Sequence, residues 1–193
     1  MVTYQIPIKH VNCYLVQVND FYIAIDAGWA GCINEYQKEL RSSSIDLKRV
    51  KYLFVTHFHP DHAGLVENLK KLGVRFVLFQ HQIPFIPIME KMLRSDRTYV
   101  PIDVNSSLIL NIDDASAFFE ENNLPAQAFK TVGHSEDSIS LVFHDGSAFI
   151  GDLYLPDLIM DDDQKSTSSW TLLRQNGAKI IYPAHGAVFH IDS

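Results

Sequence analysis

The 193-residue sequence lacks several features that would place it in familiar functional classes. It has no block of Lys and Arg and its formal net charge is −7, so we expect no nucleic-acid partner, although a metal site would reverse that sign locally. No apolar run is long enough to span a bilayer, so we expect no membrane partner. The N-terminus has no basic region followed by an apolar core, which predicts no signal peptide and a cytoplasmic protein.

Cysteine is also scarce, since the chain contains only Cys13 and Cys32. Two cysteines are too few for a disulfide framework, and buried, inert thiols are favoured over a catalytic one. Apolar residues make up 47% and charged residues 20% of the chain, which is typical of a folded globular protein and argues against disorder. We predict a single domain over residues 1–193.

Short apolar runs alternate with helical patterns along the whole chain. In the first half the predicted order is a hairpin of strands 12–18 and 21–28, a helix at 31–41, a strand at 50–56, a helix with Leu65, Leu69 and Leu72 on one face, and a strand at 74–80. A helix is expected at 88–95. The second half then reads as a strand at 107–112, a helix from Asp113, a strand at 127–132, a hairpin at 139–152, a helix at 170–175 and a strand within 178–186. The predicted class is α+β, with two similar halves whose sheets pack face to face and carry helices outside.

The stretch VTHFHPDHAG, residues 55–64, contains four potential metal ligands: His57, His59, Asp61 and His62. Solvated loop histidines are the alternative, but exposed loops more often use Gly, Ser, Asn and Asp. His57 and His59 are two apart, so just beyond a strand their side chains can converge. Asp61 and His62 lie where the chain turns into a helix and could face a second centre. Imidazole together with carboxylate suits Zn²⁺, with iron or manganese as alternatives.

Six residues cannot close two coordination shells, so further ligands are expected far along the chain. His134 in TVGHSEDS, Asp152 in FIGDLY and His185 in YPAHG each follow an apolar strand and lie beside a glycine. A single histidine of this kind would be weak evidence. The joint presence of the three residues predicts that the strand ends converge on one edge.

The order His-x-His-x-Asp-His, Gly-His, Gly-Asp and a C-terminal His-Gly resembles the metallo-β-lactamase-fold hydrolase superfamily. The runs NCYLV and AIDAG resemble the opening hairpin of its glyoxalase II-like members, which implies that Asp26 is a structural residue beneath the metals. The resemblance implies a four-layer αββα sandwich and two Zn²⁺, or alternatively Fe or Mn. It also implies the ligands: one metal on His57, His59 and His134, a second on Asp61, His62 and His185, and Asp152 bridging the two.

The loop around the third histidine departs from the family pattern. Such members often read Thr-Pro-Gly-His-Thr-Pro-Gly-Ser there, whereas this chain keeps Ser138 but has Glu136 and Asp137 in place of Pro-Gly. The shape of the loop is therefore expected to differ. No cysteine occupies a ligand position, which disfavours the lactamases that use a thiolate ligand, and His59 in place of an acid disfavours the di-iron flavoprotein branch.

These features predict a dinuclear zinc hydrolase in which a metal-bridged hydroxide attacks a small thioester, ester or lactone, with glyoxalase II-like hydrolysis first. Asp61 would ligate and accept a proton, and Tyr154 is a candidate donor to the oxyanion, with a merely packed tyrosine as the alternative. Segments 82–107 and 153–168 are expected to form the substrate pocket. In 153–168, Asp161–Asp163 are expected to be solvated, with helix capping second.

Two other classes stay open at this stage. A mononuclear iron oxygenase of the persulfide dioxygenase type would need only His57, His59 and a carboxylate such as Asp152. A non-catalytic scaffold is less favoured, because buried ligand clusters without metal would carry unpaired polar groups. The sequence also leaves a homodimer open.

Overall fold

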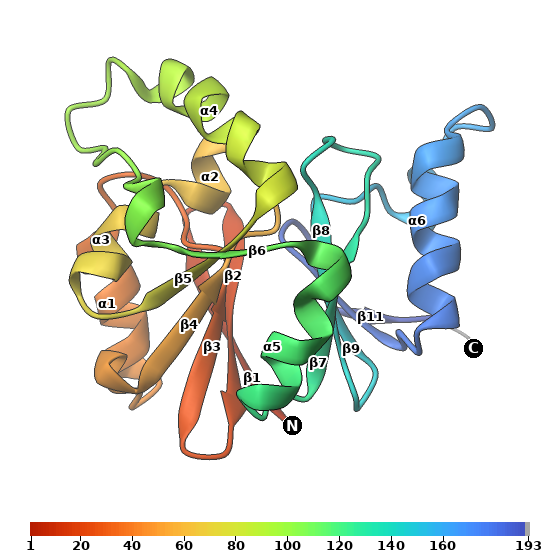
Figure 1. Cartoon of the computed structure of the whole chain (residues 1–193), viewed down its shortest axis with the longest axis horizontal. Coiled ribbons are helices and arrows are strands. Elements are labelled where there is room, and N and C mark those ends of the chain that lie inside the picture. Colours follow the sequence, from red (N-terminus) through yellow and green to blue (C-terminus); the bar gives the residue numbers. More distant parts are fainter. Residues whose placement is uncertain (192–193) are drawn as a thin grey trace. The chain divides into compact units, whose positions relative to one another are not determined.

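The structure of the protein is a computed structural model that describes residues 1–191. The chain forms two compact units, Met1–Leu110 and Asn111 onward, and each is built around its own sheet (Figure 1). The predicted class, α+β with two sheets and flanking helices, is confirmed.

The sheet of the N-terminal unit has six strands in the order β1-β2-β3-β4-β5-β6. The first three strands are antiparallel and the remaining pairs are parallel. The strands are β1 (Val2–Ile8), β2 (Val11–Val18), β3 (Phe21–Ile25), β4 (Val50–Phe54), β5 (Arg75–Phe79) and β6 (Leu108–Leu110). The helices of this unit are α1 (Ile33–Ser42), α2 (Pro60–Ala63), α3 (Val66–Lys71) and α4 (Ile86–Leu93), with 3₁₀ turns at η1 (Leu47–Arg49), η2 (Gln80–Phe85) and η3 (Val104–Ser106).

Several local predictions for this unit hold and others need correction. The hairpin turns at Asn19, whose φ of 53° is one that asparagine tolerates. Strand β1 was not predicted, although it pairs with β2 along its whole length. Of the three leucines predicted to share one helical face, Leu65 and Leu69 are buried, whereas Leu72 follows the end of α3 at Lys71 and is 43% exposed. Residues 107–112 do not open the second half, since β6 completes the first sheet beside β5.

The sheet of the C-terminal unit has five strands in the order β11-β10-β9-β8-β7. They are β7 (Ala126–Lys130), β8 (Ile139–Phe143), β9 (Ser147–Gly151), β10 (Ile180–Pro183) and β11 (Phe189–His190), and β11 was not predicted. Strands β9 and β10 are parallel, and the other pairs are antiparallel. The helices are α5 (Ala115–Glu121) and α6 (Gln164–Gln175), with 3₁₀ turns at η4 (Ile112–Asp114) and η5 (Pro156–Leu158).

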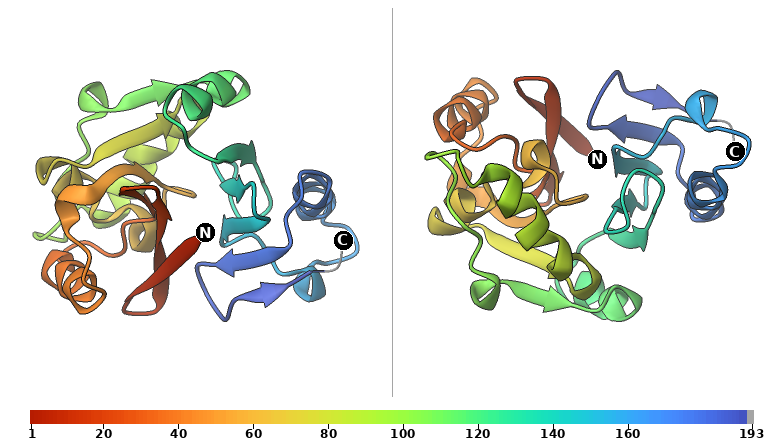
Figure 2. Two further views of the ribbon diagram at one scale, coloured as in Figure 1. Left: turned by 90° about the horizontal axis from the view of Figure 1, so that it is seen from below. Right: turned by 90° about the horizontal axis from the view of Figure 1, so that it is seen from above.

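Helix α6 packs along the C-terminal sheet (Figure 2). Its Trp170 and Leu173 are buried against Val142 of β8, Ile150 of β9 and Ile181 of β10. This apolar face fixes the helix on the three central strands of its sheet, from which two of the predicted ligand segments emerge.

The start of α6 and the loop before it are held by directional bonds. The indole Nε1 of Trp170 donates to the carbonyl of Tyr154 at 2.7 Å. Asp163 caps the helix by accepting from the backbone N–H of Ser166, and hydrogen bonding to Ser166 holds the pKa of the Asp163 carboxyl below the ordinary value. Within the run 161–163, Asp163 is therefore a cap, whereas Asp161 and Asp162 are exposed as expected.

Both cysteines are buried, Cys13 completely and Cys32 at 8% exposure. Burial raises the pKa of both thiols, most strongly that of Cys13, which favours the protonated form over the thiolate. Among residues 1–191, no helix combines the length and the apolar character that crossing a membrane requires.

Candidate metal centre

The histidine cluster lies on the short segment between β4 and α3. After β4 the chain remains buried through Thr56, and α2 begins at Pro60 with His59 as an extended N-cap residue. The backbone N–H groups of His62 and Ala63 both donate to the carbonyl of His59, at 3.1 and 3.0 Å. The four candidate ligands of this unit are therefore held within a single tight turn.

Gly64 closes this turn against the preceding loops. A Cβ at this position would lie 2.2 Å from the backbone nitrogen of Ala30 and 2.7 Å from the carbonyl oxygen of Gly28. No side chain fits where backbone atoms approach so closely. The glycine in the motif is thus required by packing.

Beneath the cluster lies Asp26, which is 2% exposed and has a φ of 60°. Its Oδ1 accepts the backbone N–H of Thr56 at 2.7 Å, and the hydroxyl of Thr56 lies 2.9–3.0 Å from both carboxylate oxygens. Its Oδ2 lies 2.9 Å from Nδ1 of His62. The structural role implied for Asp26 by the sequence thus corresponds to a bond network that joins the ends of two strands to α2.

This contact also selects the tautomer of His62. An ionised carboxylate only accepts hydrogen bonds, so Nδ1 of His62 carries the proton and Nε2 keeps its lone pair. A carboxylate that accepts from one ring nitrogen while the other nitrogen is directed to a metal is a recurring arrangement in metal sites. Asp26 therefore prepares His62 as a ligand.

The other two histidines of the cluster are paired. Nε2 of the fully buried His57 lies 3.0 Å from Nδ1 of His59, and Nδ1 of His57 lies 3.2 Å from the hydroxyl of Thr56. Two nitrogens bound to one tetrahedral zinc at their usual bond lengths lie about 3.3 Å apart. The pair therefore has a spacing suited to one metal ion. Next to it, Asp61 Oδ2 and His62 Nε2 lie 3.5 Å apart and form a second group of ligand atoms.

In the C-terminal unit, Asp152 lies between the two remaining histidines. Its Oδ2 is 3.5 Å from Nε2 of His134, and its Oδ1 is 3.5 Å from Nε2 of His185. The two oxygens of a single carboxylate are thus directed to two different imidazoles, as expected for a bridging ligand. Each of these three residues follows the end of a strand, and the backbone N–H of Ala184 donates to the carbonyl of Gly151 at 2.9 Å to hold two of the segments together.

The loop that carries His134 is anchored by α6. The buried hydroxyl of Ser169 donates to the carbonyl of Val132 at 2.6 Å. A Cβ at Gly133 would lie 2.4 Å from Oγ of Ser166, so glycine permits the close approach of loop and helix. The exposed pair Lys165–Glu136 adds an ionic contact between the same two segments. The roles of these three α6 residues were not predicted, because the loop that they contact lies 29 to 37 positions earlier in the chain.

Gln82 is a further positioning residue that the sequence did not reveal. It is fully buried, and its side-chain amide donates to the carbonyl of Val55 at 3.0 Å, with the carbonyl of Thr56 at 3.5 Å. It thereby holds the backbone just before His57. A lone glutamine in a proline-containing stretch carries no sequence signal for this role.

Tyr154, predicted as an oxyanion donor, lies beside a candidate ligand. Its ring is 5.8 Å from that of His134 in an edge-on arrangement, and its side chain is 44% exposed. The position is compatible with a group that contacts substrate, and its catalytic role stays a prediction.

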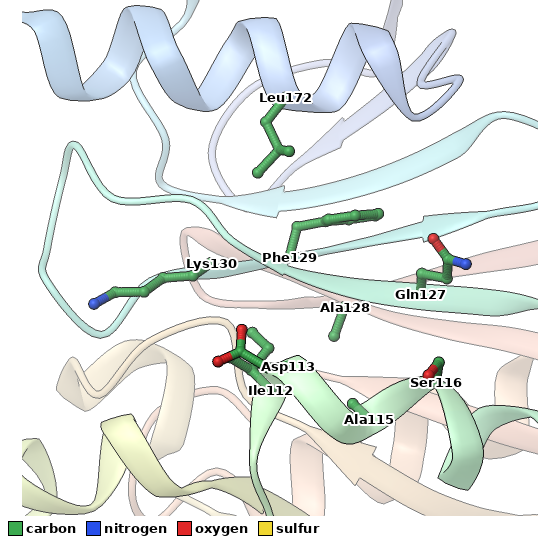
Figure 3. A pocket seen from close by; sticks show the side chains of 9 residues that line it. All are labelled: Ile112, Asp113, Ala115, Ser116, Gln127, Ala128, Phe129, Lys130 and Leu172. Carbon is green, nitrogen blue, oxygen red and sulfur yellow. The ribbon is translucent and has the colours of Figure 1, made fainter.

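A separate cavity of about 390 Å³ in the C-terminal unit contains none of the predicted ligands (Figure 3). It borders the edge strand β7, and Figure 3 shows Phe129 and Leu172 on one side of it and the α5 region on the other. The substrate pocket expected from segments 82–107 and 153–168 does not correspond to this cavity and stays a prediction.

Comparison with known proteins identifies similar sequences over nearly the whole chain. The family model described as the metallo-beta-lactamase superfamily matches residues 7–185. The chain is 26% identical to the lactamase-like protein aptB of Emericella nidulans, over 94% of this chain and 52% of that protein. It is 27% identical to the atrochrysone carboxyl ACP thioesterase nsrC of Aspergillus novofumigatus, over 94% of this chain and 50% of that protein. The chain thus spans about half the length of these relatives.

Solved structures with the same fold include two proteins of low sequence identity. TTHA1623, crystallised in a di-iron-bound form, gives a TM-score of 0.72 at 19% identity and covers 98% of this chain and 94% of its own. TTHA1429 of Thermus thermophilus is described as a metallo-beta-lactamase family protein. It gives a TM-score of 0.69 at 18% identity, and the match covers 97% of this chain and 74% of that protein. These likenesses confirm the predicted fold class.

Replacing Asp26 by asparagine is expected to weaken zinc binding by about 10- to 100-fold, because the amide cannot accept from Thr56 and His62 as the carboxylate does. The free energy of unfolding is expected to fall by about 1–3 kcal/mol, since buried donors lose their partner. Competition with a zinc chelator and urea unfolding measure the two effects. Asp20→Asn, in the exposed β2–β3 turn, is the control, and an unchanged zinc affinity in Asp26→Asn would contradict this role.

Replacing Ser169 by alanine is expected to lower the free energy of unfolding by about 1 kcal/mol, because the carbonyl of Val132 loses its donor. Zinc affinity should fall as well, since the loop that presents His134 is no longer held. Ser168→Ala on the exposed side of the same helix is the matched control, and Ser169→Thr should restore both values. If Ser169→Ala binds zinc as tightly as Ser168→Ala, the loop does not depend on this bond.

Proposed function

Because this chain belongs to the metallo-β-lactamase superfamily, we propose that it is a metal-dependent hydrolase of a thioester, ester or lactone. The observation that carries the proposal is the carboxylate of Asp152, whose two oxygens are directed to His134 and His185. A bridging carboxylate of this kind is the feature that distinguishes a dinuclear site from a single metal.

The proposed ligands are those implied by the sequence, namely His57, His59 and His134 for one metal, Asp61, His62 and His185 for the second, and Asp152 for both. Four of these residues belong to the N-terminal unit and three to the C-terminal unit. The nitrogen spacing of His57 and His59 and the orientation of His62 by Asp26 support the fit. A pair of zinc ions, when bound, supplies Lewis acidity and a water molecule whose pKa is lowered toward neutrality.

The remaining roles belong to side chains of the protein. Asp61, 17% exposed at its side chain, can accept a proton as well as ligate. Tyr154 can donate a hydrogen bond to the substrate's carbonyl oxygen, which gains negative charge as water adds to the carbonyl carbon. Asp26, Thr56 and Gln82 are buried and hold the backbone of the N-terminal cluster by hydrogen bonds.

Two observations support a hydrolase over the mononuclear iron oxygenase. That oxygenase needs only two histidines and one carboxylate as metal ligands, so Asp61, His62 and His185 would ligate no metal. A relative that covers 94% of this chain is named as an acyl carrier protein thioesterase, which favours thioesters among the candidate substrates. We further propose a cytoplasmic protein that acts on a small-molecule substrate.

Protein purified without chelators is expected to contain about two zinc ions per chain and to hydrolyse a chromogenic thioester. His59→Ala should lose at least about a hundredfold of this turnover, because a metal contributes several kcal/mol to stabilising the transition state. His144→Ala, at an exposed position outside the cluster, is the control. One iron per chain without thioester turnover would support the oxygenase, and a folded protein that binds no metal would exclude both activities.

Tyr154→Phe keeps the ring beside His134 and removes only the hydroxyl. We expect kcat for the thioester to fall by about a hundredfold with little change in KM or in zinc content, as for the loss of one oxyanion donor. Steady-state kinetics and metal analysis on the same preparation test this. Unchanged kcat would assign Tyr154 to packing alone.

A further inference from the structure

A second cavity lies at the amino ends of the parallel strands of the N-terminal sheet, opposite to the strand ends that carry the histidine cluster. It has a volume of about 520 Å³ and lies between the end of α3, the start of β5 and η3. The cluster follows the carboxyl end of β4, whereas this cavity borders the amino ends of β5 and β6. A small-molecule site is typically of this size.

The lining of this cavity is basic in a chain whose net charge is −7. Lys70, Lys71 and Arg75 contribute three positive charges, and Glu67 is the single acid in the lining. Glu67 is 8% exposed and is paired with Lys70 at 2.9 Å, which leaves the charges of Lys71 and Arg75 uncompensated within the lining. Asp103, which caps η3, offsets part of this charge from outside the lining.

Arg75 is held in place by an aromatic ring. Its guanidinium donates to the hydroxyl of Tyr52 at 2.9 Å and lies 4.5 Å from the centre of the same ring. Lys51 lies 5.2 Å from the ring of Tyr52 and adds a further positive charge nearby. In the described part of the chain, no carboxylate forms an ion pair with Lys51, Lys71 or Arg75. A fixed guanidinium loses less entropy when it binds an anion.

The donors around the cavity suit an anion with several acceptor oxygens. A guanidinium with one bond to Tyr52 retains four N–H groups, and the exposed Lys71 adds an ammonium. The side-chain amide of Asn105 also lines the cavity, whereas the hydroxyls of Ser106 and Ser107 in the same lining each donate to the carbonyl of Asp103 at 3.2 Å. A phosphate group, with its oxygens on three sides, matches such donors better than a planar carboxylate.

We propose that this cavity is a binding site for a small phosphate ester, with Lys71 and Arg75 as its principal ligand-binding residues. The proposal is independent of the hydrolase activity, because it uses neither the histidine cluster nor any residue of the C-terminal unit.

The test is a titration of the metal-loaded protein with inorganic phosphate and with adenosine monophosphate, followed by ¹⁵N amide NMR. We expect saturable shifts centred on Lys71, Arg75 and residues 105–107. Acetate, as a carboxylate probe, should bind more weakly. Shifts confined to the histidine cluster, or equal binding of acetate, would overturn the proposal.

Matched variants separate this site from phosphate bound at the metals. Lys71→Gln and the double variant Lys71→Gln/Arg75→Gln are expected to weaken phosphate binding by about tenfold or more, as expected for lost charge-assisted hydrogen bonds. Lys38→Gln/Arg41→Gln on α1 is the charge-matched control. Lys71 is exposed and makes no side-chain bond in the described structure, so Lys71→Gln should fold even if the double variant does not. Binding that is unchanged in Lys71→Gln would contradict the assignment.

Discussion

The buried carboxylate of Asp26 is the interaction on which the geometry of the N-terminal cluster depends. It receives bonds from Thr56 at the end of β4 and from His62 in α2, and its own backbone N–H donates to Phe54 at 2.9 Å. A left-handed conformation at a residue other than glycine carries a cost, which Asp tolerates better than most residues. Removing a buried charge that accepts this many hydrogen bonds would strongly destabilise the fold. The turn with the histidines is therefore fixed before any ligand binds.

The C-terminal ligands are positioned on a different principle. In the loop after His134, where the family pattern has Pro-Gly and this chain has Glu136 and Asp137, the hydroxyls of Ser135 and Ser138 lie 2.7 Å apart. The loop is then held from outside by α6, through the bond from Ser169. The position of this loop therefore depends on contacts to a helix that is itself fixed by the core around Trp170. The position of His134 therefore depends on the stability of α6.

This difference explains what could be predicted from the sequence. The ligand candidates were found because residue type, short spacing and a preceding apolar strand are all local signals. Gln82 and Ser169 were missed because each acts through a backbone carbonyl far away in sequence, and an ordinary Gln or Ser does not reveal its partner. The assignment of β6 failed for a related reason. The sequence pattern of a three-residue strand is compatible with either sheet, and only its pairing with β5 shows that β6 belongs to the N-terminal one.

The two ends of the parallel strands in the N-terminal sheet carry different kinds of side chain. Imidazoles and carboxylates gather where the strands end, while Lys51 and Arg75 lie where they begin. A five-residue strand such as β4 is about 16 Å long, which exceeds the distance over which exposed charges interact at physiological salt. Phosphate in the basic cavity would therefore have little direct electrostatic effect on the metal ligands. An influence of one end on the other would have to pass through the strands, whose buried side chains resist displacement.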